Sequence, residues 1–258
     1  MNKCKIHIIK KRHDKCTCKT VRTNQIISDN FNKNLNLYDL KDKLKDSLDE
    51  LIYFYVLTTT SYENNKIVQK GSAPNLEGGI ITLCTCKHRM RTYPDVKKDV
   101  WIAGITNKYT GPNSNNGERV GNHLFYLFKI EQYFESQFDL YQYLKDKESE
   151  AFKKKTAEQN VFGDLYTPLK NISDKHNSKN YLPINDKHVH FRDEIWKYDI
   201  EKYNDKEHKL LLGHRGKESN FVWNEPKIKL NYDVFITQGA RKLYLKDFLK
   251  LFHSNKIN

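Results

Sequence analysis

The sequence predicts an α+β fold with a mixed, mostly antiparallel β-sheet and flanking helices. Runs of β-branched and aromatic residues of strand length recur along the chain, and amphipathic helical patterns stand between some of them. Strands and helices do not alternate regularly, which argues against a doubly wound α/β fold. A chain of 258 residues is long enough to bury a full core.

The apolar runs predict strands at residues 52–57, 99–104, 124–130, 210–212 and 232–237. Apolar residues spaced by three and four predict three helices. Their apolar positions are Leu37, Leu40, Leu44, Leu48 and Leu51; Phe134, Phe138, Tyr141 and Leu144 in a helix from Glu131 onward; and Leu245, Phe248, Leu249 and Phe252. We expect the first helix to pack on the main core, with a partner surface as the alternative.

The composition favours an anionic partner. A formal net charge of +13 suits nucleic acid, nucleotides or an acidic surface, although part of the lysine excess is compositional. No apolar stretch approaches the roughly 20 residues of a membrane span, and the first residues lack the apolar core of a secretory signal. Five cysteines without such a signal indicate a reducing, cytoplasmic compartment.

Residues 1–24 form a segment with a composition of its own. It combines many basic residues with a cluster of metal-ligand types, namely Cys4, His7, His13, Cys16 and Cys18. The Cys-x-Cys spacing departs from the usual C-x2-C, and the lysines would repel a cation. We therefore predict a basic tail (1–24), a linker with an amphipathic helix (25–51) and one α+β domain (52–258), with no metal and no organic cofactor.

Residues 72–104, here called the central stretch, hold most of the unusual chemistry. A turn at residues 73–75 and the pair Gly78-Gly79 precede the polar cluster at residues 84–87, which is followed by Arg89 and Arg91. Basic groups at a strand end, near glycines that let backbone approach a ligand, suit a phosphate or a nucleotide. A glycine-rich turn followed by a solvated basic edge is the equal alternative.

Two further segments carry candidate groups. Glycines flank His214 and Arg215 after a predicted strand, which suggests another place where a ligand meets backbone. His188, His190 and Arg192 alternate and would share one strand face, either as a metal or acid–base site or as a polar surface. The sequence contains no P-loop, dinucleotide fingerprint, H-E-x-x-H motif or nucleophile elbow.

The central stretch resembles the nucleotide-modification-associated domains, small α+β proteins found mainly in phages and bacteria near genes for DNA-base modification. The matching segments are residues 73–75, 78–79, 82–83 and 85–87, with Arg89, Arg91, residues 99–102 and Gly104, then 124–130, 138–143 and 163–166. His88 and Leu165 depart from the proline and asparagine of the family pattern. The order of elements is also similar to PUA-like barrels of the EVE and ASCH groups, which implies a PUA-like barrel as the alternative architecture.

The resemblance implies binding of a modified nucleotide or of a modified base in DNA, within a phage or bacterial modification or defence system. The expected ligand-binding residues are Asn75, Gly78, Gly79, Thr85, Lys87, Arg89, Arg91, Trp101, His214 and Arg215. The alternative is a transferase or hydrolase acting on a nucleotide or DNA base, with Cys86, Asp164 or His214 as catalytic candidates. A charge-only DNA-binding protein is the third possibility.

Overall fold

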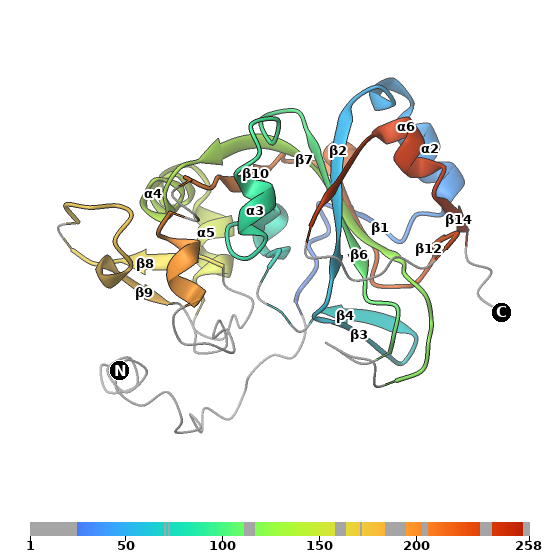
Figure 1. The fold of residues 1–258 in the computed structure, drawn as a ribbon, viewed down its shortest axis with the longest axis horizontal. Coiled ribbons are helices and arrows are strands. Elements are labelled where there is room, and N and C mark those ends of the chain that lie inside the picture. The colour runs from blue at the N-terminus through green and yellow to red at the C-terminus, as the bar shows by residue number, and fades with distance from the viewer. Residues whose placement is uncertain are drawn as a thin grey trace.

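The computed structural model describes residues 25–69, 71, 73–110, 117–157, 164–170, 172–183, 195–202, 206–232 and 239–254. These residues form an α+β fold around one mixed, mostly antiparallel sheet (Figure 1). The predicted fold class is therefore confirmed, but the barrel alternative is wrong. Strands β1 and β13 end the described sheet, which does not close on itself.

The main sheet contains eight strands, six of which lie in the order β1-β11-β7-β6-β2-β13. The strands are β1 (Asn32–Lys33), β2 (Leu51–Leu57), β5 (Thr82–Leu83), β6 (Trp101–Thr106), β7 (Leu124–Phe134), β10 (Leu210–Gly213), β11 (Asn220–Val222) and β13 (Arg241–Tyr244). Two neighbouring pairs, β2 with β6 and β1 with β11, are parallel, and the others are antiparallel.

Strand β7 is the longest element of the sheet and joins its two parts. Its first half pairs with β6 and β11, and its second half pairs with β10, which in turn pairs with β5. In Figure 1, β7 reaches from the strands on the right to the helices on the left. Residues 131–134, predicted as the start of a helix, are strand instead, because β10 supplies hydrogen-bonding partners along them.

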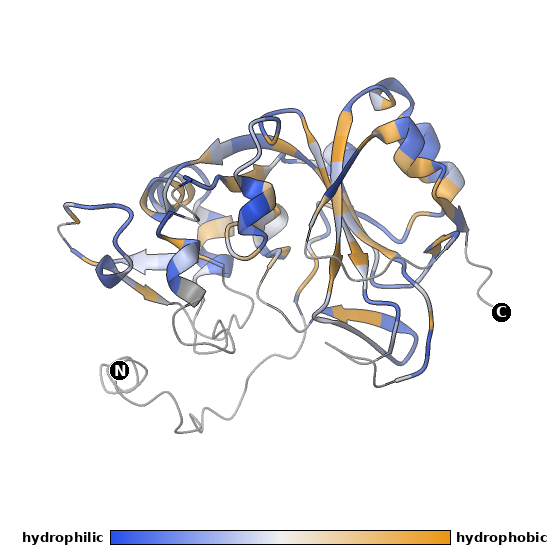
Figure 2. Cartoon of the chain, viewed as in Figure 1, coloured by the Kyte–Doolittle hydropathy of each residue, from blue (hydrophilic) through white to orange (hydrophobic). Residues whose placement is uncertain are grey.

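The sheet is buried on both faces, which explains the continuous apolar run of β2. Ile52, Phe54 and Val56 face one cluster, whereas Tyr53 and Tyr55 face another. Figure 2 shows hydrophobic residues concentrated along the central strands and on the inner sides of the helices at the right. The second cluster also contains residues of the central stretch, so this stretch covers one face of the sheet.

Helices α2 (Leu37–Lys43) and α6 (Leu245–Leu249) cover the first face. The Asn36 side chain caps α2 by accepting from the backbone N–H of Asp39 at 2.9 Å. The helix ends earlier than predicted, since a 3₁₀ turn (η1, Lys45–Ser47) follows it and Leu51 already belongs to β2. Residues 25–51 thus pack on the domain, with β1 in its main sheet.

The remaining elements lie around the second half of β7 and at the sheet ends. They are α3 (His88–Arg91), α4 (Gln137–Lys147) and α5 (Ser149–Lys155); the two-stranded antiparallel sheets of β3 (Thr60–Glu63) with β4 (Lys66–Gln69), β8 (Tyr166–Pro168) with β9 (Tyr181–Pro183), and β12 (Ile228–Leu230) with β14 (Phe252–Ser254); and the 3₁₀ turns η2 (Glu77–Gly79), η3 (Ser178–Asn180), η4 (Ile195–Asp199) and η5 (Lys217–Ser219). Among the described residues, no helix is long and apolar enough to cross a membrane.

Candidate functional site

Arg91 and Asp199 form a charged centre in the interior of the protein. Both side chains are fully buried, and Arg91 Nη2 lies 3.8 Å from Asp199 Oδ1. Arg91 also donates through Nε to the carbonyl of Cys86 at 2.9 Å and through Nη1 to the carbonyl of Lys209 at 3.0 Å. Burial lowers the pKa of Arg91, and the Asp199 carboxylate opposes that shift. The guanidinium thereby links the central stretch to β10.

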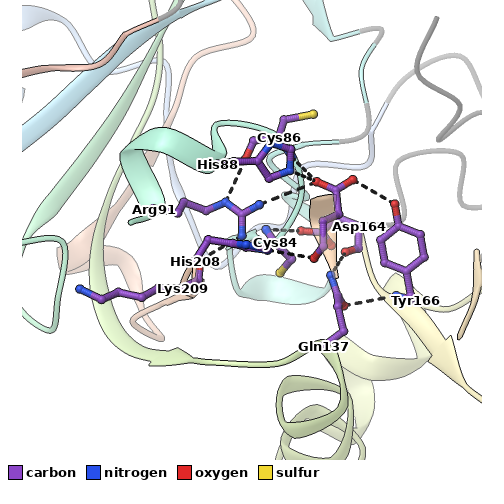
Figure 3. A network of polar contacts seen from close by, with 10 residues as sticks. Cys84, Cys86, His88, Arg91, Gln137, Asp164, Tyr166, His208 and Lys209 are labelled. Atoms are coloured by element: carbon purple, nitrogen blue, oxygen red, sulfur yellow. Dashed lines mark hydrogen bonds and ion pairs between the residues drawn. The ribbon is translucent and has the colours of Figure 1, made fainter. Parts of the chain in front are cut away.

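The Asp199 carboxylate accepts further hydrogen bonds, and its partners Cys86, His88 and Tyr166 are labelled in Figure 3. Oδ1 accepts from the backbone N–H of Cys86 at 2.9 Å and lies 2.5 Å from His88 Nε2, while Oδ2 accepts from the Tyr166 hydroxyl at 3.0 Å. His208 Nε2 lies 3.1 Å from the Asp199 carbonyl oxygen, and burial lowers the pKa of His208 to about 3. Two segments far apart in sequence are therefore tied to the Asp199 carboxylate, and a third is tied to the backbone carbonyl of the same residue.

Cys86 and Lys87 adopt an unusual backbone conformation beside this centre. Their φ angles are 58° and 51°, so two consecutive non-glycine residues lie in the left-handed region. Such conformations cost energy and persist where surrounding contacts enforce them, often at functional sites. In Figure 3 the Cys86 thiol points out of the Asp199 network, and this residue is half-buried. The network holds the turn, and the thiol lies outside the network.

A second buried charged pair lies at the other end of the central stretch. Asp164 accepts hydrogen bonds from the Thr82 hydroxyl at 3.1 Å and from the Cys84 backbone N–H at 3.3 Å. Lys155 at the end of α5 donates to the Asn75 carbonyl at 3.0 Å. Burial raises the pKa of Asp164, whereas the Lys155 ammonium counteracts this. Asp164, one of the predicted catalytic candidates, is buried, and its carboxylate holds the start of the polar cluster at Cys84.

The structure separates the predicted ligand-binding residues into exposed and buried groups. Arg89 is exposed on α3, and Lys87 is half-buried, with Nζ 3.3 Å from the Val56 carbonyl and 4.6 Å from the Tyr55 ring centroid. Burial lowers the pKa of Lys87. Arg91 is buried in its pair with Asp199, so the two arginines, which the sequence places on equal terms, have different roles.

Trp101 belongs to the core and not to a ligand face. It is buried in the cluster beneath α2 and α6, and its Nε1 donates to Glu50 Oε2 at 2.6 Å. Asn75 and Thr85 are also fully buried. Gly78 and Gly79 have φ angles of 77° and 78°, as the predicted turn requires, and Gly79 lies against residues 28–30 of the same chain.

The turn after β10 carries two of the predicted ligand-binding residues, His214 and Arg215. The Gly213 backbone N–H donates to the Ile81 carbonyl at 2.8 Å. At the opposite end of β10, the Arg91 backbone carbonyl accepts from the backbone N–H of Lys209. His214 Nε2 lies 3.7 Å from Asp99 Oδ1, and Arg215 contacts the Glu148 carboxylate. His214 and Arg215 therefore lie apart from the Asp199 centre. His188, His190 and Arg192, Gly163 and the Cys/His tail fall outside the described residues.

Three members of the buried networks had no local signal in the sequence. Asp199 is a single carboxylate between aromatic and aliphatic residues, and His208 and Lys155 lie in ordinary charged segments. Only their contacts with Cys86, Arg91 and Asn75 distinguish them. Within the described residues, no group of three or more His, Cys, Asp or Glu is arranged to hold a metal ion.

The fold and the site define an α+β protein with an open mixed sheet and a buried arginine–aspartate centre below a half-buried cysteine. Comparison of the chain with protein-family models, curated proteins and solved structures gives no match. The resemblance to the nucleotide-modification-associated domains therefore stays a prediction.

Proposed function

We propose that the protein binds a nucleotide or a modified base, free or within DNA, on the surface formed by α3 and η4. The observation that carries this proposal is the pair of groups beside His88. Arg89 follows it on α3 and is exposed, and the Tyr198 ring lies with its centroid 6.5 Å from that of His88 and is 43% exposed. An arginine fork suits phosphate, and an accessible aromatic ring suits a base.

The anchoring of α3 and η4 to each other through Asp199 supports the proposal. His88 bonds to the fully buried Asp199 carboxylate, and Tyr198 directly precedes Asp199 in sequence. A ligand would therefore meet groups that are already oriented, which lowers the entropic cost of binding. The net charge of +13 adds long-range attraction for an anion, but residues 1–24 carry more than half of it, with eight Lys or Arg and one Asp.

The test is a titration of nucleoside monophosphates and of modified and unmodified DNA with Arg89→Lys, Arg89→Ala and Tyr198→Ala. Arg89→Lys keeps the charge but loses the bidentate contact, so affinity falls by about fivefold to thirtyfold. Tyr198→Ala loses stacking, for a similar or larger decrease. Arg241→Lys, an exposed arginine on β13, is the matched control. If wild type and the Arg89 variants bind equally across a salt series, the proposed Arg89 contact is wrong, and any binding is driven by charge alone.

A second candidate function is an enzyme that uses Cys86 on a nucleotide or DNA base. Its support is the half-buried thiol on a left-handed residue whose N–H is fixed by Asp199. No described side chain is seen to act as a base on this thiol: His88 Nε2 bonds to Asp199, and the thiol points out of that network. Mass spectrometry for a substrate adduct that Cys86→Ser abolishes tests this candidate, and binding remains the leading proposal.

A further inference from the structure

The side chain of Gln25 bridges two backbone groups of the central stretch. Its Nε2 donates to the Pro74 carbonyl at 2.8 Å, and its Oε1 accepts from the Leu76 backbone N–H at 2.6 Å. One carboxamide thus satisfies an acceptor and a donor that lie two residues apart in sequence. Some 50 residues of chain separate Gln25 from these partners, so only the tertiary fold brings them together.

Gln25 belongs to a segment that lies across the Gly78-Gly79 turn; we call residues 25–30 the strap. The Ile26 backbone N–H donates to Glu77 Oε1 at 3.1 Å. A Cβ atom on Gly79 would lie 2.8 Å from Asn30 Nδ2, so the glycine allows the strap to approach. The Ile26 side chain is 62% exposed. Ile27 packs against the second core cluster, and the hydrogen bonds that tie the strap to the turn are of a polar kind that is readily exchanged for those of a ligand.

Hydrogen-bonding capacity remains unused beside this bridge. Asn75 Nδ2 and Gln69 Oε1 make no hydrogen bond within the described part of the chain, although their residues are almost completely buried. Gln69 Nε2 donates to the same Pro74 carbonyl at 3.1 Å, which places its amide at the bridge. Buried polar atoms without partners are costly and uncommon. A donor and an acceptor are therefore available next to the groups that Gln25 occupies.

We propose that the Pro74 carbonyl and the Leu76 N–H form a nucleobase-binding edge, and that the strap covers it. A carboxamide presents an N–H donor beside an acceptor, and the Watson–Crick edges of the bases present the same adjacent pair. Gln25 therefore stands in for a base. This site lies on a different turn from α3, and the inference shares only the ligand class with the proposed function.

The strap then acts as an intramolecular competitor. A base binds only when Gln25 has left, so the apparent affinity is reduced by the fraction of molecules in which the strap is open. Weakening the Gln25 bridge should increase affinity for a base without adding any contact to it. A purely structural bridge would have the opposite effect, since its loss would loosen the turn.

The experiment titrates the full chain with adenosine, cytidine, guanosine and thymidine, which lack the phosphate that Arg89 would contact. Gln25→Ala removes both hydrogen bonds and should tighten binding of at least one nucleoside by about tenfold or more. Gln25→Glu retains only an acceptor and should also tighten binding. Gln132→Ala, an exposed glutamine on β7, is the matched control and should bind as wild type does.

Hydrogen exchange supplies a second readout for the same samples. On nucleoside binding, the Ile26 amide should lose protection as the strap leaves, while the Leu76 amide stays protected by the base. The inference is overturned if Gln25→Ala binds nucleosides no more tightly than wild type, if neither binds, or if the Leu76 amide loses protection. Loss of nucleotide binding in the Arg89 variants is independent of these results, so the two proposals fail separately.

Discussion

The carboxylate of Asp199 and the backbone N–H of Cys86 lie 2.9 Å apart, although 113 residues of chain separate them. This contact fixes the left-handed turn at Cys86 from a distant part of the sequence. The same carboxylate balances Arg91 in the interior, where an unpaired charge would be costly. The arrangement of α3 therefore depends on Asp199.

Removing the Asp199 carboxylate should strongly destabilise the protein. Asp199→Ala leaves the fully buried Arg91 without its counter-charge, and we expect a loss of about 3–5 kcal/mol in the free energy of unfolding. Asp199→Asn keeps an acceptor for Cys86 and should lose less. Denaturant unfolding measures both, with Asp29→Ala as the control, because Asp29 pairs with Lys33 at the surface. A change no larger than that of Asp29→Ala would contradict the prediction.

Trp101→Ala should affect stability and not ligand binding. Trp101 is buried on the sheet face beneath α2 and α6, whereas Met90 of α3 packs in the cluster on the other face. We expect a loss of about 3–5 kcal/mol from the cavity, measured by denaturant unfolding. Nucleotide affinity, measured below the unfolding transition, should remain that of wild type. Weaker binding without a loss of stability would instead place Trp101 at the ligand.

Lys155 should make stability depend on alkaline pH. Burial lowers its pKa from 10.5 to about 8. Between these values the unfolded chain binds a proton at this amine that the folded protein has released, so its contribution to the free energy of unfolding increases with pH. Below pH 8 the cost of burying the ammonium is fully present.

The measurement compares wild type with Lys155→Met by denaturant unfolding at pH 7, 8.5 and 10. The stability of wild type relative to the variant should increase across this series. Lys154→Met, on the exposed side of α5, is the control and should show no such trend. A constant difference between wild type and Lys155→Met would mean that Lys155 keeps its ordinary pKa.

Gly104→Ala should be destabilising for a steric reason. A Cβ atom at this position would overlap the Tyr126 ring and the Leu57 side chain, both of which are buried. Overpacking of this kind costs about 1–3 kcal/mol. Gly239→Ala is the matched control, because, chain neighbours aside, no atom of the described residues lies within 4 Å of the added methyl carbon. Thermal unfolding compares the two, and equal melting temperatures would contradict the packing described for Tyr126.

Local patterns in the sequence were sufficient for much of the fold. The apolar runs at residues 52–57 and 210–212 are strands, and Leu37 and Leu40 lie on the buried side of a helix whose C-cap is the buried Leu44. Such periodicities report which side chains leave water, and burial of apolar surface follows from them directly. The predicted start of a helix at Glu131 was wrong. Residues 131–134 precede a segment with helical spacing, but their pairing with β10 makes them the end of strand β7.

The site depended on contacts that no local pattern contains. In sequence, Arg89 and Arg91 are equivalent basic residues, but the fold buries Arg91 against Asp199 and leaves Arg89 exposed. The sequence correctly predicted that Gly79 lies in a turn that allows close approach. Only the structure shows that the approaching segment is the strap. Charge and glycine content are properties of the chain itself. The partner of each buried charge is decided only when long-range packing brings distant segments together, because an unpaired charge or polar group in the interior is too costly to retain.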